Sequence, residues 1–372
     1  MIAGILTFHR ADNYGALFQA YSLYKVLSAM GLETELIDYR CAAIEDQYRY
    51  GVFPRLSKNP IYWPDLVKTF RAKKKQQKKC RKFRTKYICY GEAVYDDTDR
   101  SAVEEKYDLI VTGSDQIWNP SLTHGKDDWY AFKRHNRNHI VVSYAASVGG
   151  LHNFKYYYKF YEDDLLQYDM ISVREQNVCE YLRKNLNRSV FLTLDPTLLL
   201  SQEQWMKLRR KTYFEKLPYI LYYDVALNGE SCKIAERLAQ EKNYRLLHFN
   251  QWLRNSKNRK YVQEAGPEEF LSLISNAELI VTSSFHATVL AIQFEKRFLT
   301  VPHPTTGDRV KELLSALGLN SRIVEKSSID VCSICDREID YSQVKRQLKR
   351  YRRSSFSFLK QSIELAKTKN TL

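Results

Sequence analysis

Short apolar runs of strand length alternate with stretches of helical periodicity along most of this chain. The first run is Ile2–Phe8, and after a polar loop Ala16–Met30 places apolar residues at helical spacing up to Gly31, a residue type that commonly ends helices. Thr34–Tyr39 is the next strand-like run. A strand, a helix and a second strand in this order predict a βαβ unit, which consists of two parallel strands and a right-handed crossover.

The alternation continues to about residue 301 and predicts two sheets. Asp195-Pro196 ends the first set, because a proline disfavours helical backbone at the residue before it. Further strands are expected in the first set at Leu109–Thr112, His139–Ala145, Met170–Val173 and Val190–Leu194, and in the second set at Tyr219–Tyr223, Arg245–His248, Leu279–Thr282 and Phe298–Val301. Helices are expected near Glu230–Lys242, Pro267–Asn276 and His286–Phe294. We therefore predict an α/β protein with two Rossmann-like domains facing a cleft, a GT-B-like architecture that binds ligands at the carboxyl ends of its strands.

The chain has 372 residues, a length that suits two domains of ordinary size. We expect an N-terminal Rossmann-like domain at 1–196, a C-terminal Rossmann-like domain at 197–330 and a basic helical tail at 331–372. Residues 44–105 depart from the alternation and are expected to form a basic insertion. Within it, Arg71–Arg84 contains nine Lys or Arg in fourteen positions.

The formal net charge of +15 favours anionic partners, such as phosphorylated substrates, acidic glycans, anionic lipid or nucleic acid. No apolar run approaches the ~20 residues of a membrane-spanning helix, and the N-terminus lacks a signal-peptide pattern, so we expect a cytoplasmic protein. The seven cysteines are scattered, as is typical of free thiols in a reducing compartment. Cys332 and Cys335 lack the second pair that a zinc site needs, so no metal site is expected.

Two polar segments follow predicted strands of the first domain. Asp12, Asn13, Tyr14 and Gly15 lie where a helix begins, and the main-chain N–H groups of a helix start can hold an anion. An ordinary Asn or Asp helix cap explains the same residues equally well. The second segment is Gly113–Asn119. In it Ser114, Asp115 and Gln116 are candidate ligand residues, Asp115 could take a proton from a sugar hydroxyl, and Trp118 is expected to pack in the core.

Two further strand ends carry candidate residues. The guanidinium of Arg174 suits a carboxylate or phosphate ligand, although an ion pair with Glu175 or Asp169 is the structural alternative. Ser283, Ser284 and His286 follow a strand of the second domain. His286 is expected at the start of the next helix, where the positive end of the helix dipole disfavours the imidazolium, and facing the cleft between the domains.

Taken in order, these segments resemble the polysaccharide pyruvyl transferase family. The resemblance covers roughly residues 1–320 and lies in the Asn13-Tyr14-Gly15 loop and in the segments Gly113–Asn119, Ser172–Glu175, Leu194–Leu199 and Thr282–His286. It implies a GT-B-like fold, phosphoenolpyruvate as donor substrate, no cofactor, and a glycan or lipid-linked oligosaccharide as acceptor that receives a cyclic pyruvate ketal.

The resemblance also assigns roles to single residues. His286 corresponds to the acid and Arg174 to the donor-binding arginine of the family. One position departs from the pattern, because Ser284 stands where better-known members carry an arginine. A second cation for the donor would then come from Arg309, Arg10 or Lys311.

The basic charge raises the question of membrane and nucleic-acid partners, and the GT-B-like architecture allows one competing enzyme function. The Arg71–Arg84 run suggests peripheral contact with anionic membrane, although a solvated helix face is the simpler explanation. A nucleic-acid partner is not expected, because no known nucleic-acid-binding module is recognisable. The alternative enzyme is a GT-B nucleotide-sugar glycosyltransferase, in which Glu264 or Glu268 would bind the ribose.

Overall fold

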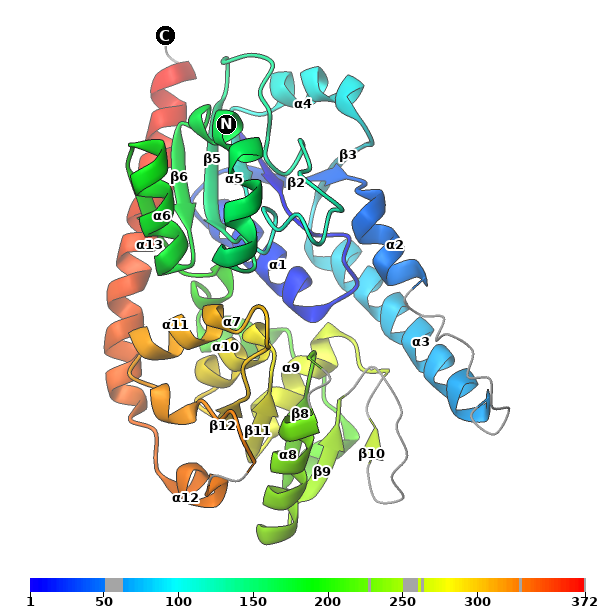
Figure 1. Ribbon diagram of the computed structural model, residues 1–372. Helices are drawn as coiled ribbons and strands as arrows, with labels where there is room; N and C mark the ends of the chain where they lie inside the picture. The colour runs from blue at the N-terminus through cyan, green and yellow to red at the C-terminus, as the bar shows by residue number, and fades with distance from the viewer. Residues whose placement is uncertain (51–62, 227–228, 250–259, 262–263, 328–329, 371–372) are drawn as a thin grey trace. The chain divides into compact units, whose positions relative to one another are not determined.

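The computed structural model describes residues 1–50, 63–226, 229–249, 260–261, 264–327 and 330–370 (Figure 1). The chain divides into two compact units, each with its own parallel sheet. Unit 1 comprises Met1–Arg49, Arg84–Leu200 and Leu348–Leu372, and unit 2 comprises Tyr50–Phe83 and Ser201–Gln347. The predicted α/β class with two Rossmann-like sheets is therefore confirmed.

Unit 1 is built on a seven-stranded sheet in the order β3-β2-β1-β4-β5-β6-β7. All its pairings are parallel. The strands are β1 (Ile2–Leu6), β2 (Glu33–Tyr39), β3 (Tyr90–Val94), β4 (Leu109–Thr112), β5 (Ile140–Ala146), β6 (Met170–Val173) and β7 (Val190–Leu192). Every residue of β4 and β5 is buried, which explains why these strands are nearly continuous apolar runs rather than alternating patterns.

The helices of unit 1 follow its strands along the chain. They are α1 (Tyr14–Ala29), α2 (Ala42–Tyr50, of which Tyr50 lies in unit 2), α4 (Arg100–Lys106), α5 (Leu151–Leu166) and α6 (Gln176–Leu186). The long helix α3 (Trp63–Tyr87) belongs to unit 2 up to Phe83. Short 3₁₀ helices occur at Asp97–Asp99 and Pro196–Leu198.

Unit 2 contains a five-stranded parallel sheet in the order β10-β9-β8-β11-β12. Its strands are β8 (Tyr219–Tyr223), β9 (Arg245–His248), β10 (Lys260–Tyr261), β11 (Leu279–Thr282) and β12 (Arg297–Thr300). Its helices are α7 (Gln202–Lys207), α8 (Gly229–Glu241), α9 (Pro267–Asn276), α10 (Phe285–Gln293), α11 (Asp308–Ala316) and α12 (Val331–Asp336), with 3₁₀ helices at Tyr213–Lys216 and Asn320–Arg322.

The expected insertion at 44–105 is not wholly outside the alternation, because it contributes β3 to the edge of the first sheet. Only Val94 of this strand is buried, so β3 lacks the apolar run that would have revealed it in the sequence. Residues 50–83 group with unit 2 instead. Within that unit, α3 forms ion pairs from Lys75 to Glu264 (2.8 Å) and from Lys79 to Glu269 (2.9 Å).

The C-terminal helix α13 (Tyr341–Asn370) differs from the expected separate tail, since its residues from Leu348 onward are part of unit 1. Phe358 lies 6.2 Å from the Tyr144 ring and 5.3 Å from the Phe191 ring, measured between centroids. Ser355 Oγ accepts a hydrogen bond from the Leu194 main-chain nitrogen (2.9 Å). The helix thus supports the strand end that precedes Asp195.

Candidate functional site

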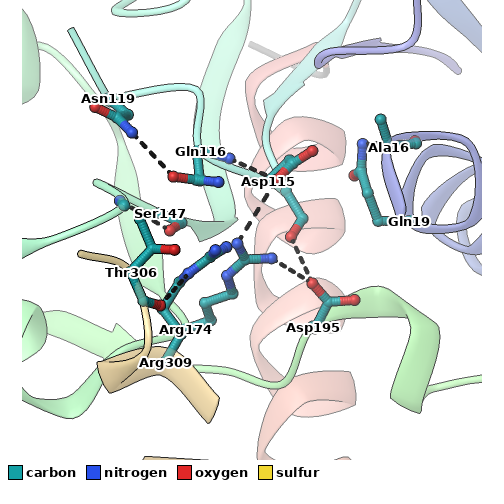
Figure 2. Close-up of polar contacts among 12 residues, drawn as sticks. Ala16, Gln19, Asp115, Gln116, Asn119, Ser147, Arg174, Asp195, Thr306 and Arg309 are labelled. Atoms are coloured by element: carbon teal, nitrogen blue, oxygen red, sulfur yellow. Dashed lines mark hydrogen bonds and ion pairs between the residues drawn. The ribbon is translucent and has the colours of Figure 1, made fainter. Parts of the chain in front are cut away.

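Four neighbouring strands of unit 1 end beside one another and bring a polar cluster together (Figure 2). Asp115 follows β4, Ser147 follows β5, Arg174 follows β6 and Asp195 follows β7. Because β4, β5, β6 and β7 are adjacent and parallel, their carboxyl ends share one edge of the sheet. This edge is where α/β folds bind ligands.

Arg174 is the centre of the cluster, and its side chain is only 2% exposed. Its guanidinium lies 2.5 Å from Asp195 Oδ2, 3.4 Å from Glu175 Oε1 and 3.6 Å from Asp115 Oδ1. Burial lowers the pKa of Arg174, but the carboxylates of Asp195, Glu175 and Asp115 outweigh this effect and raise it. The guanidinium therefore stays charged.

The structural alternative for Arg174 was an ion pair with Glu175 or Asp169. The pair with Glu175 is present, whereas Asp169 binds Arg134 at 3.0 Å. Whether Arg174 binds a donor substrate stays a prediction. In this structure the guanidinium of Arg174 contacts three carboxylates of its own unit, those of Asp195, Glu175 and Asp115.

Asp195 is a site residue that the sequence reasoning did not select. Its carboxylate is fully buried, and its Oδ1 accepts hydrogen bonds from the main-chain nitrogen (3.0 Å) and hydroxyl (2.5 Å) of Thr197. Its Oδ2 accepts from Ser114 Oγ (3.3 Å) and from Arg174. The sequence contains the signal: Asp-Pro-Thr places an N-cap acid three residues after the end of β7.

The loop after β4 has an unusual backbone. Gly113 has φ +111°, and a Cβ added there would lie 2.4 Å from the Tyr144 carbonyl oxygen, so only glycine fits. Asp115 has φ 66°, in the left-handed region that Asp tolerates better than most residues. Asp115 is only 7% exposed. Its Oδ1 accepts a hydrogen bond from the main-chain N–H of Gln116 (2.9 Å), which fixes the orientation of the carboxylate.

The other residues of this loop hold its shape. Ser147 donates its N–H to the Asp115 carbonyl (2.9 Å), and the Gln116 side-chain oxygen accepts from Asn119 (2.9 Å). The Ser114 carbonyl accepts from the Thr7 hydroxyl (3.0 Å). Trp118 is fully buried and donates its ring N–H to the Tyr130 carbonyl (3.2 Å), so its predicted packing role is confirmed.

The four predicted residues of the first loop, Asp12–Gly15, lie at the start of α1, where their contacts are with other parts of the protein. Asn13 is the N-cap, since its side-chain oxygen accepts from the Ala16 N–H (2.7 Å). Asp12 pairs with Arg84 at 2.8 Å, and Tyr14 is buried. Gly15 lies within α1 rather than in the loop. Ligand binding by these residues stays a prediction, and the helix-cap interpretation matches the contacts that are present.

A buried ion cluster beside this loop was also missed. His9 is fully buried, and its ring nitrogens lie 2.9 Å from the Thr7 carbonyl and 2.9 Å from Asp38 Oδ1. Burial lowers the pKa of His9, and Asp38 opposes that shift. Although burial opposes it, hydrogen bonds from His9 and Arg10 hold the pKa of Asp38 below its usual value. The guanidinium of Arg10 is therefore already paired with the carboxylate of Asp38, so Arg10 is a weaker candidate for the second cation that binds the donor.

In unit 2 the predicted Ser283, Ser284 and His286 lie at the carboxyl end of β11 and the start of α10. Ser283 donates to Asp224 Oδ1 and accepts from the Val225 main-chain nitrogen (2.9 Å). Ser284 is the N-cap of α10, with its hydroxyl 3.4 Å from the Ala287 nitrogen. His286 occupies the second position of the helix and is half-buried, with its ring edge-on to Phe285 at 5.2 Å.

The proposed second cations differ in their contacts within unit 2. The Arg309 guanidinium lies 5.6 Å from the Phe285 ring centroid, beside the residue that precedes His286, and its Nε donates to the Thr306 carbonyl (3.3 Å). Lys311 pairs with Glu325 at 2.7 Å. Arg309 is the candidate that the structure brings close to the α10 segment.

The structure therefore brings Ser114, Asp115, Gln116 and Arg174 together in unit 1. Separately, it brings Ser283, Ser284, His286 and Arg309 to one region of unit 2. Within the described ranges, no three His, Cys, Asp or Glu side chains are arranged to hold a metal ion. None of the helices in these ranges combines the length and apolar character needed to cross a bilayer.

Solved structures with this architecture confirm the GT-B fold. The UDP-N-acetylglucosamine 2-epimerase of Rickettsia bellii superposes with a TM-score of 0.55 at 12% identity, covering 99% of this chain and 97% of that chain. The UDP-GlcNAc 2-epimerase of Methanocaldococcus jannaschii, in complex with UDP-GlcNAc and UDP, has a TM-score of 0.51 at 12% identity, covering 94% and 99%. At this identity the likeness concerns the fold alone.

Comparison of the sequence identifies the family, which the likeness in fold does not. No curated protein sequence matches this chain significantly. The model of one family, polysaccharide pyruvyl transferase, matches residues 13–304, a range that includes the strand-end cluster of unit 1 and the β11–α10 segment of unit 2. That range is well over half of the chain, and the chain therefore belongs to the polysaccharide pyruvyl transferase family.

Proposed function

We propose that this transferase moves pyruvate from phosphoenolpyruvate onto two hydroxyls of one sugar. The acceptor would be a bacterial surface polysaccharide or its lipid-linked precursor, and the product a cyclic pyruvate ketal. The match of residues 13–304 to the family is the observation that carries this proposal. A polar cluster at the strand ends of a GT-B fold is compatible with it.

The reaction has requirements that protein side chains can meet. A proton must reach the methylene carbon of phosphoenolpyruvate, which leaves an oxocarbenium-like C2. One sugar hydroxyl attacks C2 and loses its proton, and the C2–O bond to phosphate then breaks. The second hydroxyl attacks C2, loses its proton and closes the ring, so the net products are the ketal and inorganic phosphate. One acid, one base and anion-stabilising groups are needed.

His286 is the proposed acid that protonates the methylene carbon. The acid role is what the family resemblance implies. The place of His286 in the first turn of α10 supports its being next to the donor, because the N–H groups and the dipole of a helix start favour a bound anion there. Arg309, close to Phe285, is the proposed cation that takes the place of the arginine missing at Ser284.

Asp115 is the proposed base that accepts a hydroxyl proton. Its carboxylate is held by the Gln116 N–H and lies 3.6 Å from Arg174. The contacts of Arg174 with Asp195 and Glu175 support a positioning role for this arginine more than direct donor binding. We propose that Arg174 orients Asp115 and offsets its charge.

The test is His286→Ala in a phosphate-release assay with phosphoenolpyruvate and an acceptor glycan. Loss of a general acid typically costs ~10²–10⁴-fold in rate, so kcat should fall by about that factor. His152→Ala is the matched control, because His152 is an exposed residue of α5 in unit 1. Near-normal turnover of His286→Ala would remove this residue from the mechanism.

A nucleotide-sugar glycosyltransferase remains the competing function, since the fold neighbour from M. jannaschii is in complex with UDP-GlcNAc and UDP. Of its candidate ribose ligands, Glu264 pairs with Lys75 at the surface. Thermal-shift titration separates the two functions, because a ligand at 100 times its Kd stabilises the folded state by about 2.7 kcal/mol. Stabilisation by UDP-sugars but not by phosphoenolpyruvate would contradict the proposal.

A further inference from the structure

Helix α3 has one strongly basic face that its own unit leaves exposed. Between Leu66 and Tyr87 the helix carries no acidic residue. In the part of this helix that belongs to unit 2, up to Phe83, seven basic side chains are exposed: Lys68, Arg71, Lys74, Lys75, Lys78, Arg81 and Lys82. Since successive helical residues are about 100° apart, these seven fall within an arc of roughly 140°.

The opposite side of α3 packs inward. Gln76, Gln77, Cys80 and Phe83 are buried, and they lie across the helix from the basic arc. The helix therefore has a fixed rotation, and these seven exposed charges point away from the packed side, whereas Arg84 is buried on it. A merely solvated face would not need such separation, because lysines and acidic residues usually alternate on it.

The basic arc is also linear. The span from Lys68 to Lys82 corresponds to about 21 Å of helix at 1.5 Å per residue. In Figure 1, α3 is drawn as one continuous, straight helix. Side chains on one side of a straight helix can all reach a flat surface at once, whereas a DNA groove curves away from a straight helix after a few turns.

The chemistry of the arc also favours a flat anionic surface over nucleic acid. The aromatic residues of α3 within the described side chains are Phe70, Phe83 and Tyr87, and none of them is exposed. Lys74 lies over the Phe70 ring at 5.6 Å, so this ring is not offered to a base. Single-stranded nucleic acids are held largely by stacking on exposed aromatic rings.

We propose that the basic arc of α3 docks this enzyme on an anionic lipid bilayer. The contact is electrostatic, because Val67 is the single large apolar side chain of the helix among the described residues that is exposed. Each basic residue near such a surface strengthens binding by roughly five-fold. The proposal goes beyond the transfer reaction and does not depend on it, since docking is measured without substrate.

The experiment is flotation of the full chain with vesicles of phosphatidylglycerol and phosphatidylcholine at about 0.1 M salt, where the Debye length is about 10 Å. The variant carries Lys68→Gln, Arg71→Gln, Lys74→Gln and Lys78→Gln. At roughly five-fold for each residue, its partition coefficient should fall several hundred-fold. The wild type should leave the vesicles at about 1 M salt and ignore pure phosphatidylcholine.

The matched control removes the same charge elsewhere. Lys349, Arg350, Arg353 and Lys360 are exposed on α13, and their replacement by Gln lowers the net charge equally. This control should keep most of the binding. An equal loss in both variants would show that only net charge matters and would overturn the proposal. Equal binding of the wild type to anionic and pure phosphatidylcholine vesicles, or retention on duplex DNA at about 0.2 M salt without vesicle binding, would also overturn it.

Discussion

Removing the charge of Asp195 should destabilise unit 1, although the change from Asp to Asn is nearly isosteric. The asparagine oxygen can still accept both hydrogen bonds from Thr197. Ser114 can turn its hydroxyl toward the Ala145 carbonyl, 3.2 Å away. What Asp195→Asn cannot replace is the 2.5 Å contact with the guanidinium of Arg174.

The magnitude follows from what remains around Arg174. Breaking a fully buried ion pair costs about 3–5 kcal/mol, since it leaves one charge without its partner. Here Glu175 and Asp115 still lie 3.4 Å and 3.6 Å from the guanidinium and offset part of that cost. We therefore expect the free energy of unfolding to fall by about 1.5–3 kcal/mol, the range for a hydrogen bond to a charged group.

The assay is native-state hydrogen exchange of the β5 amides at increasing urea, which reports the unfolding of unit 1 separately from that of unit 2. Glu162→Gln is the control, because Glu162 of the same unit pairs at 2.7 Å with Lys159, whose side chain is 81% exposed. Water can replace that partner, so the control should leave the free energy of unfolding nearly unchanged. If Asp195→Asn costs no more than the control, Arg174 does not depend on Asp195 and the reasoning fails.

Two further predictions concern unit 1. Gly113→Ala should lower the melting temperature and activity together, because it adds a Cβ 2.4 Å from a carbonyl oxygen at φ +111°; an unchanged melting temperature would contradict the steric argument. His139 is buried without a hydrogen-bond partner for either ring nitrogen in the described residues, and burial lowers its pKa to about 4, against 6.5 for an ordinary histidine. Because the unfolded chain binds this proton first, the wild type should lose stability as the pH falls from 6.5 to 4, by about 3 kcal/mol from this residue. His139→Phe should remove that part of the pH dependence in urea titrations, and an unchanged profile would exclude His139 as its source.

Much of the fold was predictable because its central strands are buried on both faces. The expected strands Leu109–Thr112, Met170–Val173 and Leu279–Thr282 have the bounds seen in the structure. The helix after β1 begins two residues earlier than expected, at Tyr14, since Asn13 is its cap. The edge strand β3 escaped prediction because it buries a single side chain.

The candidate site was predictable in position but not in its contacts. The rule that ligands bind at strand ends selected Asp115 and Arg174 from local sequence. The ion pair between Arg174 and Asp195 could not be predicted from local sequence. Asp195 is 21 residues away in the chain and becomes a neighbour of Arg174 only when β6 and β7 pair. The same holds for Arg84, which lies 72 residues after Asp12 in sequence and pairs with it in space.

The sequence by itself determined the alternation of strands and helices, the basic character of α3 and the family, since each depends on residue order alone. The tertiary structure decided which charges neutralise one another and which stay exposed. Sheet order places Asp115, Arg174 and Asp195 on adjacent strands, and packing of Cys80 and Phe83 turns the lysines of α3 outward. Both outcomes arise from contacts between distant segments, which local patterns of apolar and charged residues do not encode.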